Sequence, residues 1–270
     1  MELPTLEVRS LGALIDHATP AAPDPRTGRR RDSGVYRGGG DARWPLLTSL
    51  DRLGGIHPPH TKRALESHIL RNWVRYSRPF FPHARNEWEL LVAAQHHGLP
   101  TRLLDWTYSP LVAAHFATLG RTRGERTPGD RVIWRLDWQR VHRHFGFPEI
   151  ALFTDDLDHL RDADGDGHFT PWELMRAEAG IAPFACLIEP PTLDTRIAAQ
   201  SAVFTLSSDA TQPLDRFLDA HGLLGAITRF VIPSDAVAQV RDQLDLATMD
   251  ERRLFPDLDG VAAQLRRYYS

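Results

Sequence analysis

The segment from Asp162 to Glu173 constrains its own conformation more tightly than any other part of the chain. Aspartates stand at its first, third and fifth positions, a glycine at its sixth and a glutamate at its last. Calcium loops of the EF-hand type place oxygen ligands at positions 1, 3, 5, 7, 9 and 12, with a glycine at position 6 for the turn. We therefore predict a calcium ion here, bound by Asp162, Asp164, Asp166, the main-chain carbonyl of His168, Thr170 and Glu173.

The flanks of this loop agree with two short helices. Thr154 and the acidic residues after it are typical of a helix start, and Thr170, Pro171 and Glu173 form a capping-box pattern for a second helix. The alternative is an acidic surface turn, in which four crowded carboxylates would repel one another. We find no second loop in the sequence to pair with Phe169, so a single loop of modest affinity is expected, either as a structural clip or as a sensor.

Composition and length indicate an ordinary globular protein. The chain has 270 residues, of which 42% are hydrophobic and 25% charged, enough for one large domain or two small ones. No segment resembles a membrane span or a signal peptide, so no membrane contact and a cytoplasmic location are expected. Cys186 is the only cysteine, which excludes a disulfide within the chain and favours a buried position.

The charge of the chain excludes general polyanion binding. Its formal net charge is −3, so contact with a nucleic acid would require a local basic patch. Arg29, Arg30 and Arg31 follow a proline-rich stretch and could form such a patch. We favour a solvated loop there over a phosphate-binding arm.

Periodicity predicts an α+β protein. Apolar residues recur at helical spacing in four segments, and short apolar runs bounded by polar residues indicate strands. The expected helices cover 6–17, 61–76, 86–95 and 110–116, and the expected strands cover 34–38, 132–136 and 229–232.

A dense polar cluster lies between the expected helices at 86–95 and 110–116. It runs from His96 to Thr107, where Arg102 and Asp105 bracket an apolar dipeptide and Ser109 starts the next helix. Charged groups beside a buried strand need partners. The cluster is thus either a structural ion pair or a ligand site beside a helix N-terminus, and the residue types alone leave both open.

Several of these segments resemble the FRG domain family. The resemblance rests on Tyr36-Arg37-Gly38, on 44–52, on 89–117, and again on 196–206 and 254–260. The segment around the calcium loop has no counterpart, so it is expected to be a peripheral EF-hand-like insertion. The predicted organisation is an FRG-like domain at 1–140 and 181–270, built from mixed small sheets flanked by helices, with the insertion at 141–180.

The pattern also resembles the NAD-binding half of arginine-class ADP-ribosyltransferases. That resemblance implies that Arg37 holds the diphosphate of NAD and that Gln200 stands where a catalytic glutamate is usual. Because glutamine carries no charge, Asp105 or Glu189 would have to supply the carboxylate. The implied catalytic residues are Arg37, Asp105 and Gln200, and the implied NAD-binding residues are Tyr36, Arg37, Gly38, Gly39, His96, His97, Thr101, Arg102 and Ser109.

Three functions remain open on the sequence. The first is an NAD-dependent ADP-ribosyltransferase-like enzyme with a nucleic-acid or protein acceptor. The second is a non-catalytic nucleotide- or nucleic-acid-binding module in which Trp106 stacks on a base. The third is a structural interaction domain.

Overall fold

A computed structural model describes residues 3–25, 27–54, 56–81, 84–119, 129–158, 169–176, 180–191 and 195–269. Four of the predicted calcium ligands, Asp162, Asp164, Asp166 and His168, lie outside the described residues, so the structure does not test them. No helix among the described ranges has the length and apolar content needed to cross a membrane.

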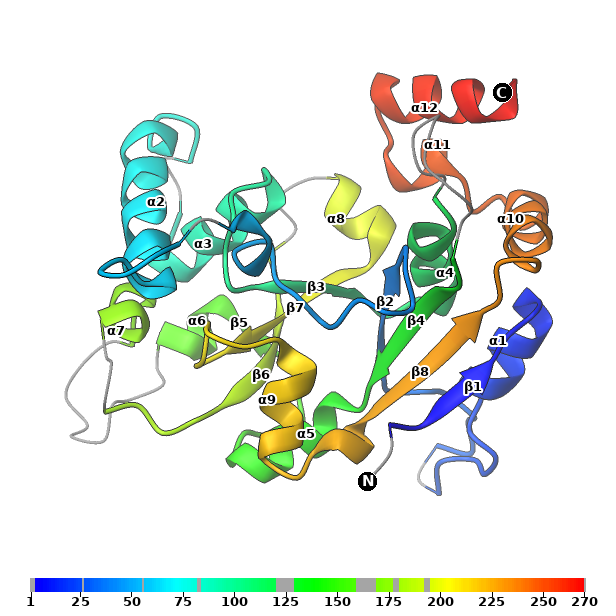
Figure 1. Ribbon diagram of the computed structural model, residues 1–270, viewed down its shortest axis with the longest axis horizontal. Helices are drawn as coiled ribbons and strands as arrows, with labels where there is room; N and C mark the ends of the chain where they lie inside the picture. Colours follow the sequence, from blue (N-terminus) through cyan, green and yellow to red (C-terminus); the bar gives the residue numbers. More distant parts are fainter. Residues whose placement is uncertain are drawn as a thin grey trace.

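The architecture is a mixed sheet covered by helices on both faces (Figure 1). Eight strands follow the order β1-β8-β4-β2-β3-β7-β6-β5, in which only the two outermost pairs are parallel. The prediction of an α+β class is confirmed, but the expected separate small sheets are joined into one. The strands are β1 Thr5–Glu7, β2 Val35–Gly39, β3 Leu104–Thr107, β4 Arg131–Leu136, β5 Leu152–Phe153, β6 Ala185–Glu189, β7 Ala202–Ser207 and β8 Ile227–Ile232.

Helices connect most of the strands, and many begin at a side-chain cap. Ser10, Thr61, Asn86, Ser109 and Asp257 each accept a hydrogen bond from a main-chain N–H in the first turn of the helix that follows. The helices are α1 Leu11–Ala18, α2 Lys62–Ser77, α3 Glu87–His96, α4 Pro110–Thr118, α5 Trp138–Phe145, α6 Thr154–Asp158, α7 Pro171–Arg176, α8 Thr195–Gln200, α9 Leu214–Ala220, α10 Val237–Leu246, α11 Glu251–Leu254 and α12 Leu258–Tyr268, with 3₁₀ turns at Asp51–Leu53 and Leu224–Ala226.

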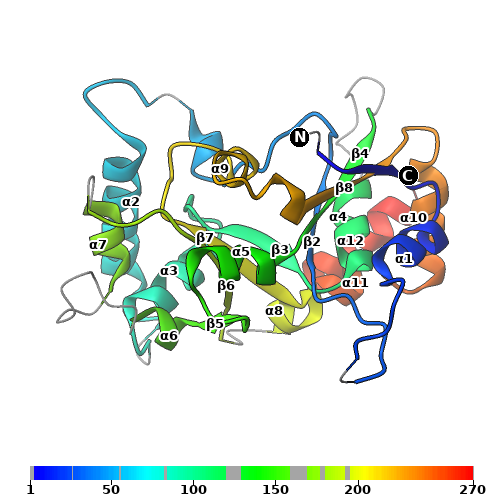
Figure 2. The same ribbon diagram turned by 90° about the horizontal axis from the view of Figure 1, so that it is seen from below.

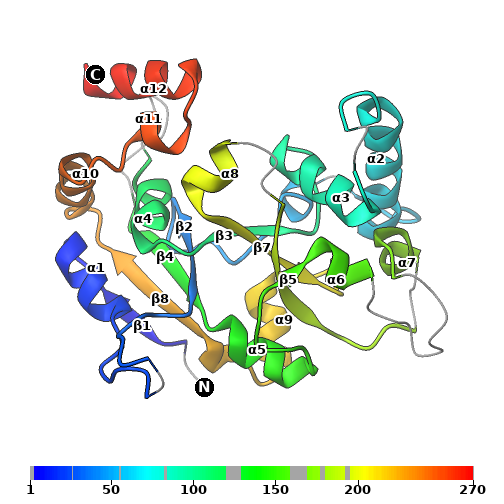
Figure 3. The same cartoon turned by 180° about the vertical axis from the view of Figure 1, so that it is seen from behind.

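The sheet narrows to a seam in its middle. Strands β2 and β3 share a single residue pair, Tyr36 with Thr107, whereas β2 and β4 share five. Beyond that pair the two strands diverge, and the two halves of the sheet run in different directions (Figures 1 and 3). The seam therefore leaves a gap between β2 and β3, whereas the other neighbouring strands are joined by longer hydrogen-bonded ladders.

Three hydrophobic clusters cover the sheet, and alternation along each strand assigns residues to them. One face of the first half packs Tyr36, Ile133 and Phe230 against α1, α4 and α10. The opposite face packs α5 and α9 across both halves of the sheet. The remaining face of the second half is covered by residues of α2, α3, α6 and α7.

Most elements predicted from periodicity are confirmed, with small shifts. The expected helices at 61–76, 86–95 and 110–116 correspond to α2, α3 and α4, and the expected strands correspond to β2, β4 and β8. The helix expected at 6–17 is wrong at its start, because Thr5–Glu7 pair with β8 as an edge strand. That pairing is made with a strand more than two hundred residues away, and local periodicity carries no signal for it.

The flanks of the calcium loop are part of the core. Leu157, Leu174 and Met175 are buried beside Trp88 of α3, and Phe169 is 7% exposed. The indole Nε1 of Trp88 also donates to the carbonyl of Phe169 at 2.7 Å. The expectation of a peripheral insertion is therefore wrong for these flanks, although the domain boundaries themselves stay a prediction.

Candidate functional site

A cavity of about 890 Å³ opens at the seam of the sheet. Strands β2 and β3 form its floor, and the walls come from the end of α3, from α4, from α8 and from the segment that precedes α12. Figures 1 and 3 show α3, α8 and α11 gathered around this point from distant parts of the chain. The divergence of β2 from β3 thus produces a concave site where the sheet would otherwise be continuous.

Arg37 lies at the floor of the cavity, where the two strands part. Its Nη1 donates to the main-chain carbonyl of Asp105 at 2.7 Å and lies 3.5 Å from the Asp105 carboxylate. The side chain is 21% exposed, and burial together with the positive charge of Arg52 lowers the pKa of the guanidinium, which Asp105 opposes. Among the described residues, Nε and Nη2 of Arg37 have no partner, so one edge of the planar fork faces the cavity.

The Asp105 carboxylate is oriented by Gln95. The amide Nε2 of Gln95 lies 3.1 and 3.0 Å from the two carboxylate oxygens. The orientation of that amide is fixed at its oxygen, because Oε1 accepts from the Thr101 hydroxyl at 2.6 Å and lies 3.3 Å from Ser49 Oγ. The carboxylate is 53% exposed, so it is held in place while an oxygen remains open to a ligand.

Positive charge dominates the cavity. The described residues that line it include Arg37, Arg52 and Arg196 against the carboxylates of Asp105 and Asp257. Asp257 is already engaged as the cap of α12, where it accepts from Gly260 N at 2.8 Å. The guanidinium of Arg196 lies 4.8 Å from the ring centroid of Phe255. A ligand with negative charge near its centre suits this distribution.

Helix α4 is brought against β2 by a glycine. A Cβ added at Gly38 would lie 2.1 Å from the Ala113 carbonyl oxygen and 2.5 Å from Ala117 N. Gly38 therefore permits the close packing of α4 against β2. The packing places Val112, Ala113 and Phe116 of α4 in the cavity wall.

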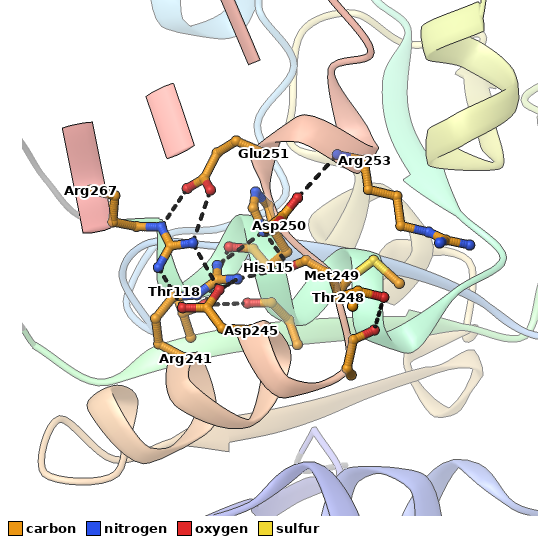
Figure 4. A network of polar contacts seen from close by, with 12 residues as sticks. His115, Thr118, Arg241, Asp245, Thr248, Met249, Asp250, Glu251, Arg253 and Arg267 are labelled. Carbon is orange, nitrogen blue, oxygen red and sulfur yellow. Dashed lines mark hydrogen bonds and ion pairs between the residues drawn. The ribbon is translucent and has the colours of Figure 1, made fainter. Parts of the chain in front are cut away.

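A buried charge network joins α4 to α10, α11 and α12, and so to the helices on either side of Pro256 and Asp257 in the cavity wall (Figure 4). Arg241 Nη1 lies 3.0 Å from His115 Nδ1, and Arg241 Nη2 donates to the Met249 carbonyl at 2.8 Å. Because a guanidinium only donates, Nδ1 of His115 accepts here, and burial together with the charge of Arg241 lowers the pKa of His115 to about 4. Arg267 then joins Asp245 and Glu251, each at 2.7 Å, which ties α12 to α10 and α11.

Seven of the residues predicted for the NAD site line this one cavity. They come from β2, α3, β3 and α8, so the structure brings together positions that are far apart in the sequence. They are Tyr36, Arg37, Gly38, His96, His97, Asp105 and Gln200.

Gln200 differs from its expected setting. It ends helix α8 instead of lying on a strand, and its amide Nε2 donates to the Leu254 carbonyl at 3.0 Å. Its side chain thereby joins α8 to the segment before α12. Glu189, the other substitute for a catalytic glutamate, accepts from the Tyr108 hydroxyl at 2.6 Å and is absent from the cavity lining among the described residues.

Four other predicted residues do not line the cavity. Gly39 faces Val132, Thr101 is 1% exposed behind Gln95, and the Ser109 hydroxyl caps α4 by accepting from Val112 N at 3.3 Å. Arg102 is buried in an ion pair with Glu66. Of the two alternatives for the polar cluster, a structural ion pair or a ligand site, the ion pair is therefore correct for this residue. Thr101 still acts on the site indirectly, through the Gln95 amide.

The stacking role suggested for Trp106 is also wrong. Its side chain is 3% exposed, and its Nε1 donates to Thr205 Oγ1 at 3.0 Å. Trp88 and Trp134 are also buried, and Cys186 is buried as predicted.

Sequence reasoning missed Gln95, Ser49, Arg52 and Arg196. Gln95 stands directly before the polar cluster, where its spacing assigned it only to the end of a helix. Arg52 and Arg196 follow apparently ordinary surface patterns, and only the three-dimensional arrangement turns them toward Arg37.

The described part of the predicted calcium loop has the expected cap. Thr170 N donates to Glu173 Oε2 at 2.8 Å, and Glu173 N donates to Thr170 Oγ1 at 3.2 Å, which is a reciprocal capping box. No cluster of three or more potential metal-ligating His, Cys, Asp or Glu side chains occurs within the described ranges.

Comparison with known proteins supports one family. The model of the FRG domain family matches residues 32–127, which contain β2, α2, α3, β3 and α4. This range supplies Arg37, Asp105 and Gln95 and hence the floor of the cavity. No curated protein and no solved structure matches the chain.

Proposed function

We propose that the cavity binds NAD and that the protein is an ADP-ribosyltransferase-like enzyme. The observation that carries this proposal is the placement of Arg37 and Asp105 side by side at the seam, in a cavity with two further arginines. The open edge of Arg37 presents two N–H donors at the spacing that phosphate oxygens accept, and Arg52 adds a second positive charge beside it. A diphosphate between two nucleosides suits this centre.

Asp105 supplies the carboxylate that the chemistry needs. When the bond between nicotinamide and ribose breaks, its electron pair leaves with nicotinamide and positive charge develops on the ribose. The Asp105 carboxylate, held by Gln95 on one side, stabilises that charge or holds a ribose hydroxyl. An acceptor then forms the new bond to the same carbon and loses a proton to solvent.

The experiment measures NAD binding and nicotinamide release by the intact chain. Arg37→Lys keeps the charge but loses the planar fork, so NAD binding weakens about tenfold or more. Asp105→Asn lowers the rate of release more than it lowers NAD affinity, because its role is in the transition state. Arg143→Lys, an exposed arginine paired with Glu149, is the matched control and leaves both unchanged.

A second candidate is a non-catalytic nucleotide-binding module, which the same arginines favour. NAD binding without nicotinamide release, under any acceptor condition, selects this candidate over the enzyme. Absence of both binding and release rejects NAD as the ligand of the cavity.

We also propose that the loop from Asp162 to Glu173 binds calcium. Its support is the ligand spacing in the sequence together with the Thr170–Glu173 capping box. Titration calorimetry is the test, and Glu173→Gln abolishes most of the binding if the glutamate is a ligand. Unchanged calcium affinity in that variant contradicts the site.

A further inference from the structure

One face of α2 carries positive charge without matching negative charge. Arg71, Arg75 and Arg78 are spaced by four and three residues, which places them on one side of the helix, and all three are exposed. The only carboxylate in α2 is Glu66, which is buried and already paired with Arg102. Within the described ranges, none of the three guanidinium groups lies within ion-pair distance of a carboxylate.

Two large aromatic side chains that are close to these arginines in the sequence are exposed. Tyr76 is 67% exposed and Phe80 is 79% exposed, although residues of this size are usually placed in a core. The Arg75 guanidinium lies 5.4 Å from the ring centroid of Tyr76. We call Arg71, Arg75, Tyr76, Arg78 and Phe80 the basic face.

The C-terminal end of the basic face lies near the cavity. The ring centroid of Phe81, the residue after Phe80, lies 5.9 Å from that of His97. Trp73 lies on the opposite side of α2 from Arg71 and Arg75, and its ring centroid is 5.8 Å from that of His97. His97 lines the cavity, so the end of α2 packs against one of its walls. Figures 1 and 2 show α2 at one end of the molecule, with α3 and α7 beside it.

We propose that the basic face binds a single-stranded nucleic acid and that the bound strand is the acceptor for the cavity. Arginines contact the phosphates, and the exposed rings stack on bases that a duplex would keep paired. From Arg71 to Arg78 the helix rises about 10 Å, the length of about three nucleotide steps along a strand. An acidic peptide would use the arginines but would leave Tyr76 and Phe80 exposed.

The acceptor role rests on the proposed function, whereas strand binding does not. In the transfer, the bond between nicotinamide and ribose breaks and nicotinamide leaves with the electron pair. A nucleophilic nitrogen or oxygen of the strand bonds to the ribose carbon and releases its proton to solvent. NAD supplies the transferred group, so no further reactant is needed.

The first measurement is fluorescence anisotropy of a labelled 20-nucleotide strand with the intact chain. DNA and RNA strands of one sequence, their duplexes and a polyglutamate competitor form the arms. The combined variant Arg71→Gln, Arg75→Gln and Arg78→Gln is expected to weaken binding tenfold or more. The slope of the logarithm of the binding constant against the logarithm of the salt concentration should become shallower by about two. Tyr76→Ala with Phe80→Ala weakens binding to single strands about tenfold and hardly changes binding to duplexes.

The matched control is Arg29→Gln with Arg30→Gln and Arg31→Gln. It removes the same charge from another exposed stretch of the chain, and binding is expected to be retained. If this control loses binding while the α2 variant retains it, the arm and not α2 is the site. Equal affinity for duplexes, or equal competition by polyglutamate, also overturns the proposal.

The second measurement separates this inference from the proposed function. Incubation with NAD followed by mass spectrometry of the strand detects one added ADP-ribose, and free nicotinamide is measured in parallel. Nicotinamide release without strand modification overturns the acceptor role alone. No release at all contradicts the proposed function, and the anisotropy result still decides whether the basic face binds the strand.

Discussion

Arg102 and Glu66 form an ion pair in which each side chain is 1% exposed, with Arg102 Nη2 at 2.7 Å from Glu66 Oε2. Arg102 N and Nε donate to the same carboxylate at 2.9 and 2.8 Å, so the Glu66 carboxylate accepts from both the main chain and the side chain of Arg102. The pair joins α2 to Arg102, two residues before the start of β3. It therefore fixes the position of α2, and with it the basic face, relative to the strand that carries Asp105.

Replacing Glu66 by Gln should destabilise the protein by about 3 kcal/mol or more, because Arg102 is left buried without a counter-charge. Urea unfolding followed by circular dichroism measures the change in free energy. Glu149→Gln, which breaks the exposed pair with Arg143, is the control and should change stability by less than about 1 kcal/mol. Similar effects in both variants would show that the buried pair is not needed for the fold.

Acid should loosen the C-terminal helices through His115. Burial and Arg241 lower its pKa in the folded protein to about 4 from the ordinary histidine value of 6.5, so the folded state favours the neutral ring. The associated stability is present above pH 6.5 and is lost as the pH falls from 6.5 through about 4. His115→Asn keeps an acceptor for Arg241 without titrating, so its free energy of unfolding should fall less over this range. Parallel pH profiles for both proteins would contradict this role.

Gly38→Ala should displace α4 from β2. The added Cβ would lie 2.1 Å from the Ala113 carbonyl, and the backbone must shift to relieve the contact. We expect a loss of about 1–3 kcal/mol, measured by thermal unfolding, and weaker binding of any ligand of the cavity. Gly129→Ala is the control, since no described residue lies within 4 Å of its Cβ position and stability should hardly change.

Gln95→Glu should alter the acid–base behaviour of Asp105. The variant replaces the donating Nε2 by a carboxylate oxygen beside the Asp105 oxygens, and two adjacent carboxylates resist ionising together. The pH profile of nicotinamide release should then move to higher pH, while Gln95→Met lowers the rate without such a shift. An unchanged profile in Gln95→Glu would mean that Asp105 is not part of the chemistry.

Local signals predicted much of the fold, and long-range contacts explain the rest. Caps and apolar spacing located α2, α3 and α4, and the Tyr36-Arg37-Gly38 strand was placed correctly. The pairing of Arg102 with Glu66 depends on how α2 packs against β3, which no local pattern contains. The role of Gln95 also depends on contacts that no local pattern contains, because its amide oxygen accepts from Thr101 and its amide nitrogen donates to Asp105.

The short pairing of β2 with β3 removes main-chain hydrogen bonds from the sheet, and a side chain replaces one of them. A longer ladder would give the carbonyl of Asp105 a main-chain donor from β2, but it would also close the space that forms the cavity. Arg37 reaches across the divergence and donates to that carbonyl instead. One guanidinium thus bridges the two strands and also forms part of the cavity floor, so the place where the sheet opens is held by a hydrogen bond across it.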